Sequence, residues 1–250
     1  MSDNGPPQSM TNGPVIGIVW PGPATHLEVE EAMQFVPPGV ALHSSSPAMK
    51  AEGTGGITLE RVEALAESSH IEEAAATLTL SGMAAICYAC TSTSYVRGPD
   101  GDVDIIDRIT RSTGIPASTT STAMIKALRH LKVQRVSVLS PHIDPLNERL
   151  TTFLEAADIE VVAMTGLNMK KGIDELKPES NKDLIVKEVD HNSADGIFIS
   201  CTSMRAATVL NDIEQQICKP VVTAIQASLW DLLRLAGWSG QLQRRGRLFR

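Results

Sequence analysis

Two copies of the tripeptide Cys-Thr-Ser are the residues of this sequence most suited to chemistry. The first begins at Cys90 and the second at Cys201. A thiolate is a strong nucleophile and a proton acceptor, and neighbouring hydroxyl groups can hydrogen-bond a carboxylate. Two such sites facing one substrate would supply an acid, a base or a nucleophile on each of its faces.

A buried structural role is the alternative for each cysteine, because free cysteine is among the most buried residue types. Packing alone, however, does not require the same polar tripeptide twice. We therefore predict that Cys90 and Cys201 are catalytic. The hydroxyl residues that follow them are predicted to bind the carboxylate of a substrate: Thr91, Ser92, Thr202 and Ser203.

The two other cysteines are expected to be structural. Cys87 forms a C-x-x-C with Cys90, a spacing found in thiol redox and zinc sites. This signal is weak, because side chains three positions apart in a strand point to opposite faces, and no second C-x-x-C is present. Cys218 is interpreted in the same way. A redox protein built on Cys87 and Cys90 is an alternative, and it predicts reversible oxidation of that pair in preference to Cys201.

Alternating strand and helix patterns must position these cysteines. We expect strands at 15–20, 40–43, 84–89, 115–118, 135–139, 159–163, 196–200 and 221–223. The clearest helical patterns cover 59–80, 121–131, 145–157, 182–192, 204–217 and 226–236. This alternation predicts an α/β fold with parallel sheets. Each Cys-Thr-Ser then follows a strand and precedes a helix, where ligands bind and where the helix dipole lowers the pKa of a thiol.

The chain also repeats itself. Residues 16–21 match 136–141, residues 84–92 match 195–203, and residues 114–116 match 218–220. Three matches in the same order predict two similar lobes related by a pseudo-twofold axis, with the active site in the cleft between them. We expect the first lobe at 14–118 and the second at 119–223. Residues 224–250 should return to the first lobe, and residues 1–13 should form a disordered leader.

Composition excludes several other classes of protein. The chain of 250 residues has 42% hydrophobic content, which allows a substantial core. Its net charge of -7 argues against a nucleic-acid surface, and the one basic run, 244–247, is short. No apolar segment is long enough to span a bilayer, and the first residues do not resemble a secretory signal, so a cytoplasmic location is expected. The expected partner is a small carboxylate, and assembly into a homo-oligomer stays open.

These features resemble the Asp/Glu racemase superfamily, and within it the branch of maleate cis-trans isomerases and arylmalonate decarboxylases. The resemblance covers nearly the whole chain. Its marks are the two cysteine segments, residues 21–25, residues 139–141 followed by Asn147, and the ending 246–248. It implies an isomerase without metal or organic cofactor. In such an enzyme Cys90 attacks the substrate or removes its proton, and Cys201 is the partner acid or base.

The resemblance also helps to separate activities within this branch. The decarboxylases keep only the second cysteine and have glycine at the first position, so the presence of both cysteines indicates isomerisation or racemisation. Further substrate contacts are implied at Pro21, Gly22, Ala24 and His142. Ala24 stands where maleate isomerases have asparagine, and His142, which titrates near neutrality, stands where they have tyrosine. The resemblance implies a further asparagine, whose place is taken by a residue around Lys170, or by Asn168. These departures argue against maleate as the substrate.

Maleate-like cis-trans isomerisation is the first functional expectation. Cys90 would add to the double bond, and the adduct would rotate about a single bond before elimination. Racemisation of aspartate, glutamate or a hydantoin is the alternative, in which one cysteine removes the α-proton and the other delivers a proton from behind. A two-lobed binding protein without turnover is the alternative from another class. It predicts that ligand binding survives when both cysteines are changed to serine.

Overall fold

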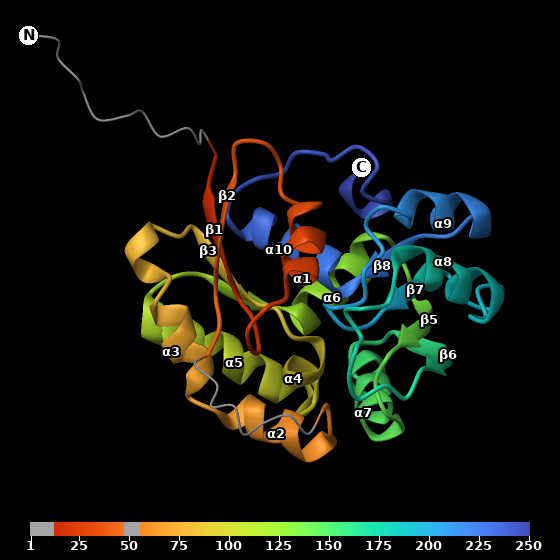
Figure 1. Ribbon diagram of the computed structural model, residues 1–250, viewed down its shortest axis with the longest axis horizontal. Helices are drawn as coiled ribbons and strands as arrows, with labels where there is room; N and C mark the ends of the chain where they lie inside the picture. Colours follow the sequence, from red (N-terminus) through yellow and green to blue (C-terminus); the bar gives the residue numbers. More distant parts are fainter. Residues whose placement is uncertain (1–12, 48–55) are drawn as a thin grey trace, which may run out of the picture.

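Two parallel sheets of four strands form the framework of the protein (Figure 1). The computed structural model describes residues 13–47 and 56–250. The first sheet has the order β2-β1-β3-β4 and the second has the order β6-β5-β7-β8. The strands are β1 (Val15–Val19), β2 (Ala41–Ser45), β3 (Ala85–Tyr88), β4 (Ala117–Thr119), β5 (Arg135–Ser140), β6 (Glu160–Gly166), β7 (Gly196–Ile199) and β8 (Val221–Thr223). The equivalent strand order in the two halves confirms the predicted α/β class with two similar lobes.

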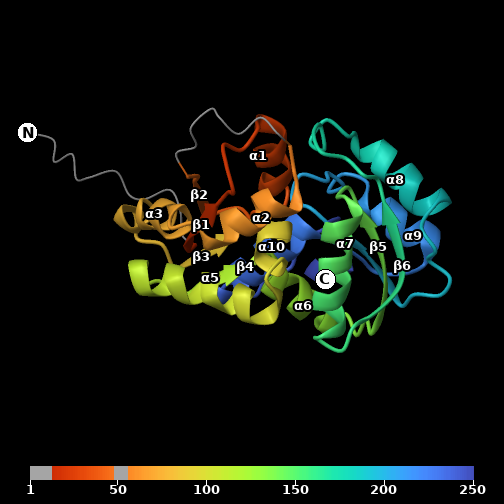
Figure 2. The same cartoon turned by 90° about the horizontal axis from the view of Figure 1, so that it is seen from below.

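Helices flank both sheets, as Figure 2 shows from a second direction. In the first half they are α1 (His26–Met33), α2 (Leu59–Glu67), α3 (His70–Ala76), α4 (Thr91–Tyr95) and α5 (Gly98–Thr113). In the second half they are α6 (Thr120–His130), α7 (Asp144–Glu155), α8 (Pro178–Lys187), α9 (Leu210–Ile217) and α10 (Ala224–Leu235). No helix of the described residues is long and apolar enough to cross a bilayer.

Helix α10 ties the two halves together. Its residues from Ala224 to Leu233 are all buried, and it packs against β3 and β4 of the first sheet, β8 of the second, and α6. A helix that is buried on every side belongs to the interior of a protein. The tail beyond it also contacts the first half, because Phe249 stacks on Phe35 with ring centroids 5.9 Å apart. One hydrophobic core therefore extends through both lobes.

The parallel strands bring the loops that carry the cysteines to corresponding sheet edges. In the first sheet Val19 pairs with Tyr88, so the loop after β1 lies beside the loop that begins at Cys90. In the second sheet Leu139 pairs with Ile199, which places the loop after β5 beside the loop of Cys201. The carboxyl ends of parallel strands are where α/β folds bind ligands.

The predicted single helix over 59–80 is wrong, because α2 ends at Glu67 and α3 begins at His70. Arg108 of α5 explains the break. Its guanidinium donates hydrogen bonds to the carbonyl oxygens of Ala66 and Ser68, and it pairs with Glu72 at 2.6 Å. A side chain that binds the last carbonyls of a helix stabilises its end. The pattern within 59–80 could not reveal a partner from α5.

The predicted helix over 204–217 begins six residues later, at Leu210. Glu31 of α1 explains the delay. Its carboxylate accepts hydrogen bonds of 2.7 Å from the backbone N–H groups of Ala206 and Ala207. These groups are therefore satisfied without helical geometry. The predicted helix at 182–192 starts earlier, because Pro178 occupies the first turn of α8, a position that suits proline.

Candidate active site

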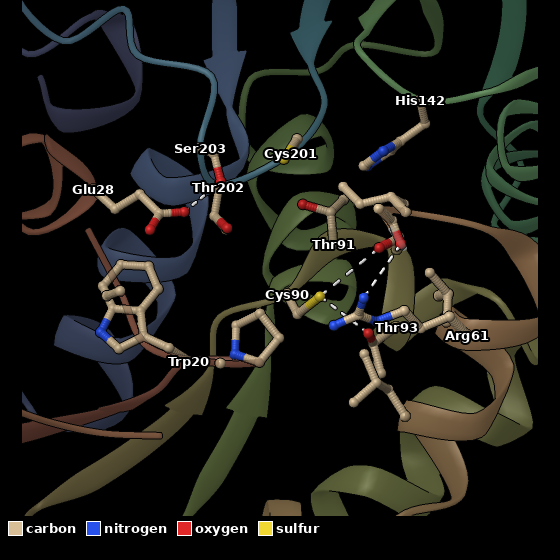
Figure 3. Close-up of a pocket in the computed structure, with 18 of the residues that line it drawn as sticks. Trp20, Glu28, Arg61, Cys90, Thr91, Thr93, His142, Cys201, Thr202 and Ser203 are labelled. Atoms are coloured by element: carbon tan, nitrogen blue, oxygen red, sulfur yellow. Dashed lines mark hydrogen bonds between the residues drawn. The ribbon is translucent and has the colours of Figure 1, made fainter. Parts of the chain in front are cut away.

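A cavity of about 710 Å³ lies between the lobes at the strand ends that carry both cysteines (Figure 3). All ten residues that the sequence nominated line it: Pro21, Gly22, Ala24, Cys90, Thr91, Ser92, His142, Cys201, Thr202 and Ser203. Cys90 and Cys201 both line this cavity, each from the loop that follows a strand of its own sheet. The structure thus brings the nominated residues together, while their individual roles stay predictions.

Cys90 occupies the N-cap position of α4, two residues after the end of β3 at Tyr88, with an extended backbone. Its thiol donates a hydrogen bond of 3.0 Å to Thr93 Oγ1, and it lies 3.8 Å from Ser92 Oγ. Ser94 Oγ donates to the carbonyl of Cys90 at 2.7 Å, which fixes the start of the helix. The first Cys-Thr-Ser therefore has the predicted position between a strand and a helix.

Cys201 has a different backbone. Its φ is +76°, a left-handed conformation that residues other than glycine seldom adopt and that is often found at functional sites. A turn follows it rather than a helix, so the predicted helix N-terminus is wrong for this cysteine. Burial raises the pKa of Cys201 to about 12, although hydrogen bonding by the backbone and side chain of Ser203 lowers it. Cys201 is accordingly a thiol at neutral pH in this structure.

His142 lies in the cavity wall just after β5 and is 1% exposed. Neither ring nitrogen has a hydrogen-bond partner among the described residues. Burial lowers the pKa of His142 to about 4, so the expected titration near neutrality is wrong. A neutral imidazole with two unpartnered nitrogens can donate one hydrogen bond and accept another.

Three charged residues of the cavity wall escaped the sequence reasoning: Glu28, Arg61 and Lys171. Glu28 comes from α1 and accepts a hydrogen bond from Ser203 Oγ of the other lobe. It also forms a capping box with Thr25, a pattern that the spacing Thr-x-x-Glu makes visible in the sequence. Lys171 lines the cavity in place of its neighbour Lys170, whose backbone carbonyl instead accepts from Ile57 N at 3.0 Å.

The remaining wall is largely apolar. Trp20 follows β1, and the side of the cavity formed by α2 and the residues before it contributes Ile57, Val62 and Leu65. Figure 3 shows Arg61 reaching into the cavity from α2 toward Cys90. A ligand with both a carboxylate and an apolar portion would match this combination of surfaces.

The other cysteines lie outside the cavity. Cys87 is fully buried in β3, where burial raises its pKa, as expected for a structural residue. Cys218 is exposed, and with a φ of +58° it forms the C-cap of α9. Within the described residues no group of three His, Cys, Asp or Glu side chains is placed to hold a metal ion.

Comparison with known proteins places this cavity in a wider context. The model of the arylmalonate decarboxylase family matches residues 25–249. The arylmalonate decarboxylase of Bordetella bronchiseptica is 30% identical over 94% of this chain and 96% of its own. The maleate isomerase of Alcaligenes faecalis is 27% identical over 54% of each chain. In fold, the chain resembles a Nocardia farcinica maleate cis-trans isomerase mutant with a covalently bound succinylcysteine intermediate, with a TM-score of 0.83, 20% identity, and coverage of 95% of this chain and 98% of that one.

Proposed function

Because this chain belongs to the arylmalonate decarboxylase family, we propose that it is a cofactor-independent isomerase of a small carboxylate that works through Cys90 and Cys201. This membership confirms the resemblance drawn from the two Cys-Thr-Ser segments. The observation that carries the proposal is that both cysteines line one cavity from opposite lobes. Two thiols placed in this way can act on opposite faces of a bound molecule.

Geometric isomerisation would proceed by reversible addition. The Cys90 thiolate forms a sulfur–carbon bond to one carbon of the double bond. The π electron pair of the double bond moves to the neighbouring carbon. The Cys201 thiol gives its proton to that carbon, which leaves a single bond that can rotate. Return of the proton to Cys201 and loss of the Cys90 sulfur regenerate the double bond in the trans form. No atom is gained or lost, so no co-reactant is needed.

Unpartnered polar atoms in the cavity wall would bind the carboxylate. Thr91 Oγ1 is buried and has no hydrogen-bond partner among the described residues, and the same holds for both nitrogens of His142. Buried polar groups without partners are costly, so a ligand that hydrogen-bonds them gains affinity. Donors aimed at a carboxylate would also stabilise charge that spreads onto it during the reaction.

Racemisation is a second candidate, and the apolar part of the cavity lining supports a substrate other than maleate for it. A volume of about 710 Å³ exceeds what a four-carbon diacid such as maleate or aspartate fills, so it favours a larger substrate. A carboxylate with an apolar substituent would occupy the wall formed by Trp20, Val62 and Leu65. One thiolate would then take the α-proton while the opposite thiol delivers another proton from behind, which inverts the carbon.

Incubation with candidate substrates in heavy water distinguishes these reactions. We would follow maleate, aspartate, glutamate, a hydantoin and one enantiomer of 2-phenylpropionate by proton NMR and by polarimetry. A geometric change in maleate supports cis-trans isomerisation, and α-deuterium exchange with loss of optical activity supports racemisation. The variant with both Cys90→Ser and Cys201→Ser is the control. Ligand binding that persists in this control, without turnover of any substrate by the wild type, would instead support a binding protein.

A further inference from the structure

Serine and threonine hydroxyl groups surround the backbone of Cys90. The carbonyl oxygens of four consecutive residues, from Tyr88 to Thr91, each accept a hydrogen bond from such a group. The donors are buried and come from three separate parts of the chain, and we call them the hydroxyl cradle. They are Thr120 to Tyr88 O at 3.4 Å, Thr202 to Ala89 O at 3.4 Å, Ser94 to Cys90 O at 2.7 Å, and Ser94 and Ser121 to Thr91 O at 3.0 and 3.4 Å.

Ser94 is the centre of the cradle. Its hydroxyl group donates to two carbonyls around Cys90, and its oxygen accepts from the backbone N–H of Ser121 at 3.2 Å. The hydroxyl oxygens of Ser94 and Ser121 also lie 2.7 Å apart, within hydrogen-bond distance. Two serines that bind each other therefore anchor the start of α4, which carries Cys90 as its N-cap, to the start of α6.

The cradle fixes the two peptide groups on either side of Cys90. A peptide group is planar, so a hydrogen bond to its carbonyl oxygen orients the whole group. Thr202 holds the group that precedes the Cα atom of Cys90, and Ser94 holds the group that follows it. The orientations of these two planes set φ and ψ of Cys90, and the allowed rotamers of its side chain depend on φ and ψ. The cradle therefore determines where the sulfur points in the cavity.

The second cysteine is held in a different way. In the internal repeat Arg205 occupies the place of Ser94, since each lies four residues after its cysteine. The guanidinium of Arg205 donates to two carbonyls of the loop before α8. The loop after Cys201 is instead bound by Glu31, through two backbone N–H groups. The cradle is therefore a feature of the Cys90 side of the cavity.

We propose that the hydroxyl cradle positions Cys90 for its attack on the substrate, with Ser94 as the main positioning residue. Addition requires the sulfur to approach one carbon of the double bond in a narrow range of directions. A misplacement of about 1 Å can lower the rate about 10²-fold. The cradle supplies this alignment before a substrate binds. This proposal rests on the proposed function, because it concerns the sulfur that acts as the nucleophile there.

Carbon-13 NMR tests the positioning without any substrate. The chain has four cysteines, so protein labelled with 3-¹³C-cysteine gives four Cβ signals, which single Cys-to-Ser variants assign. The chemical shift of a cysteine Cβ depends on its backbone angles and its rotamer. Ser94→Ala should therefore shift and broaden the signal of Cys90, and it should leave the signal of the exposed Cys218 in place. Thr202→Val should also shift the Cys90 signal, whereas Thr202→Ser, which keeps the hydroxyl group, should restore it.

Ser137→Ala is the matched control. The hydroxyl group of Ser137 also donates to a backbone carbonyl, that of Asp190, and the residue is fully buried but does not line the cavity. This variant should leave the Cys90 signal and kcat unchanged. With an active substrate, Ser94→Ala should lower kcat about tenfold and leave KM within about twofold, because a misaligned sulfur slows the reaction more than it weakens binding.

Several outcomes would overturn the proposal. One is an unchanged Cys90 signal in Ser94→Ala, and another is an equal loss of kcat in Ser137→Ala, since loss of any buried hydroxyl group would then suffice. If Ser94→Ala does not fold, Thr202→Val and Thr202→Ser decide the same question, and unchanged Cys90 signals in both contradict the cradle. The absence of turnover by the wild type would count against the proposed function alone, because the NMR signals need no substrate.

Discussion

The two cysteines of the cavity have different backbone conformations. Cys90 has the extended conformation of an N-cap, whereas Cys201 has a left-handed conformation. For an L-residue other than glycine this conformation costs roughly 1–2 kcal/mol. Glycine would avoid that cost, so a cysteine at this position agrees with the proposed role of its sulfur in the cavity. Cys218 shares the left-handed conformation but lies at an exposed helix end, so backbone strain alone does not identify a site.

Removal of either cavity thiol should stop turnover. Cys90→Ala and Cys201→Ala should each lower kcat by about 10²- to 10⁴-fold, because each removes a group that exchanges a proton or a bond with the substrate. Circular dichroism should show that both variants fold. Cys218→Ser is the matched control and should keep the wild-type kcat, because that residue is exposed and does not line the cavity. Full activity of either alanine variant would exclude a two-thiol mechanism.

Among secondary-structure elements, strands were predicted more accurately than helices. Strands such as β1 and β7 are runs of buried apolar residues between turn residues. Each of these two strands also has a matching strand in the other half of the internal repeat, which supports its assignment. Helix ends depend on partners that are distant in sequence, such as Arg108 at the end of α2. The residues nominated for the site line one cavity for a related reason, since the ends of the strands determine where the residues that follow them lie. Glu28 was missed because its partner Ser203 lies in the other half.

Glu31 shows how one side chain of α1 shapes the loop of the second cysteine. It is 4% exposed, and a single carboxylate oxygen accepts from both Ala206 N and Ala207 N. Burial raises the pKa of Glu31, whereas these two hydrogen bonds lower it. The loop after Cys201 therefore depends on α1 for the hydrogen bonds that helical geometry would otherwise supply.

Substitution of Glu31 should separate these effects. Glu31→Ala leaves two buried N–H groups without a partner and should lower the free energy of unfolding by about 2–4 kcal/mol. It should also lower kcat, because the Cys201 loop loses its anchor. Glu31→Gln keeps an acceptor oxygen and should lie within about 1 kcal/mol of the wild type. Urea unfolding of the three proteins measures this order, and equal losses in both variants would contradict it.

For the whole molecule, two buried groups oppose each other in their response to acid. Burial raises the pKa of Asp102 to about 6, so the stability it contributes is lost as the pH rises from about 4 to about 6. Burial lowers the pKa of His142 to about 4, so stability is lost as the pH falls from about 6.5 to about 4. Each effect amounts to about 3 kcal/mol. They cover nearly the same range with opposite sign, so they largely cancel.

Single substitutions should reveal each hidden effect. His142→Phe removes the group that resists protonation, so this variant should become more stable between pH 6.5 and pH 4.5 relative to the wild type. Asp102→Asn removes the group that gains from protonation, so this variant should lose stability over the same range. Denaturant unfolding at several pH values measures both slopes. Parallel curves for all three proteins would show that neither group titrates in this range.

The continuous core around α10 also limits how the cavity can admit a ligand. Two-lobed proteins often close around a ligand by swinging about a hinge, which requires a thin connection between the lobes. Here buried side chains of both sheets pack against one interior helix. Phe249, near the C-terminus, adds a further contact between the halves by stacking on Phe35. Rotation of one lobe against the other would separate these packed side chains and expose the shared core to water. We therefore expect a ligand to enter and leave without rotation of one lobe against the other.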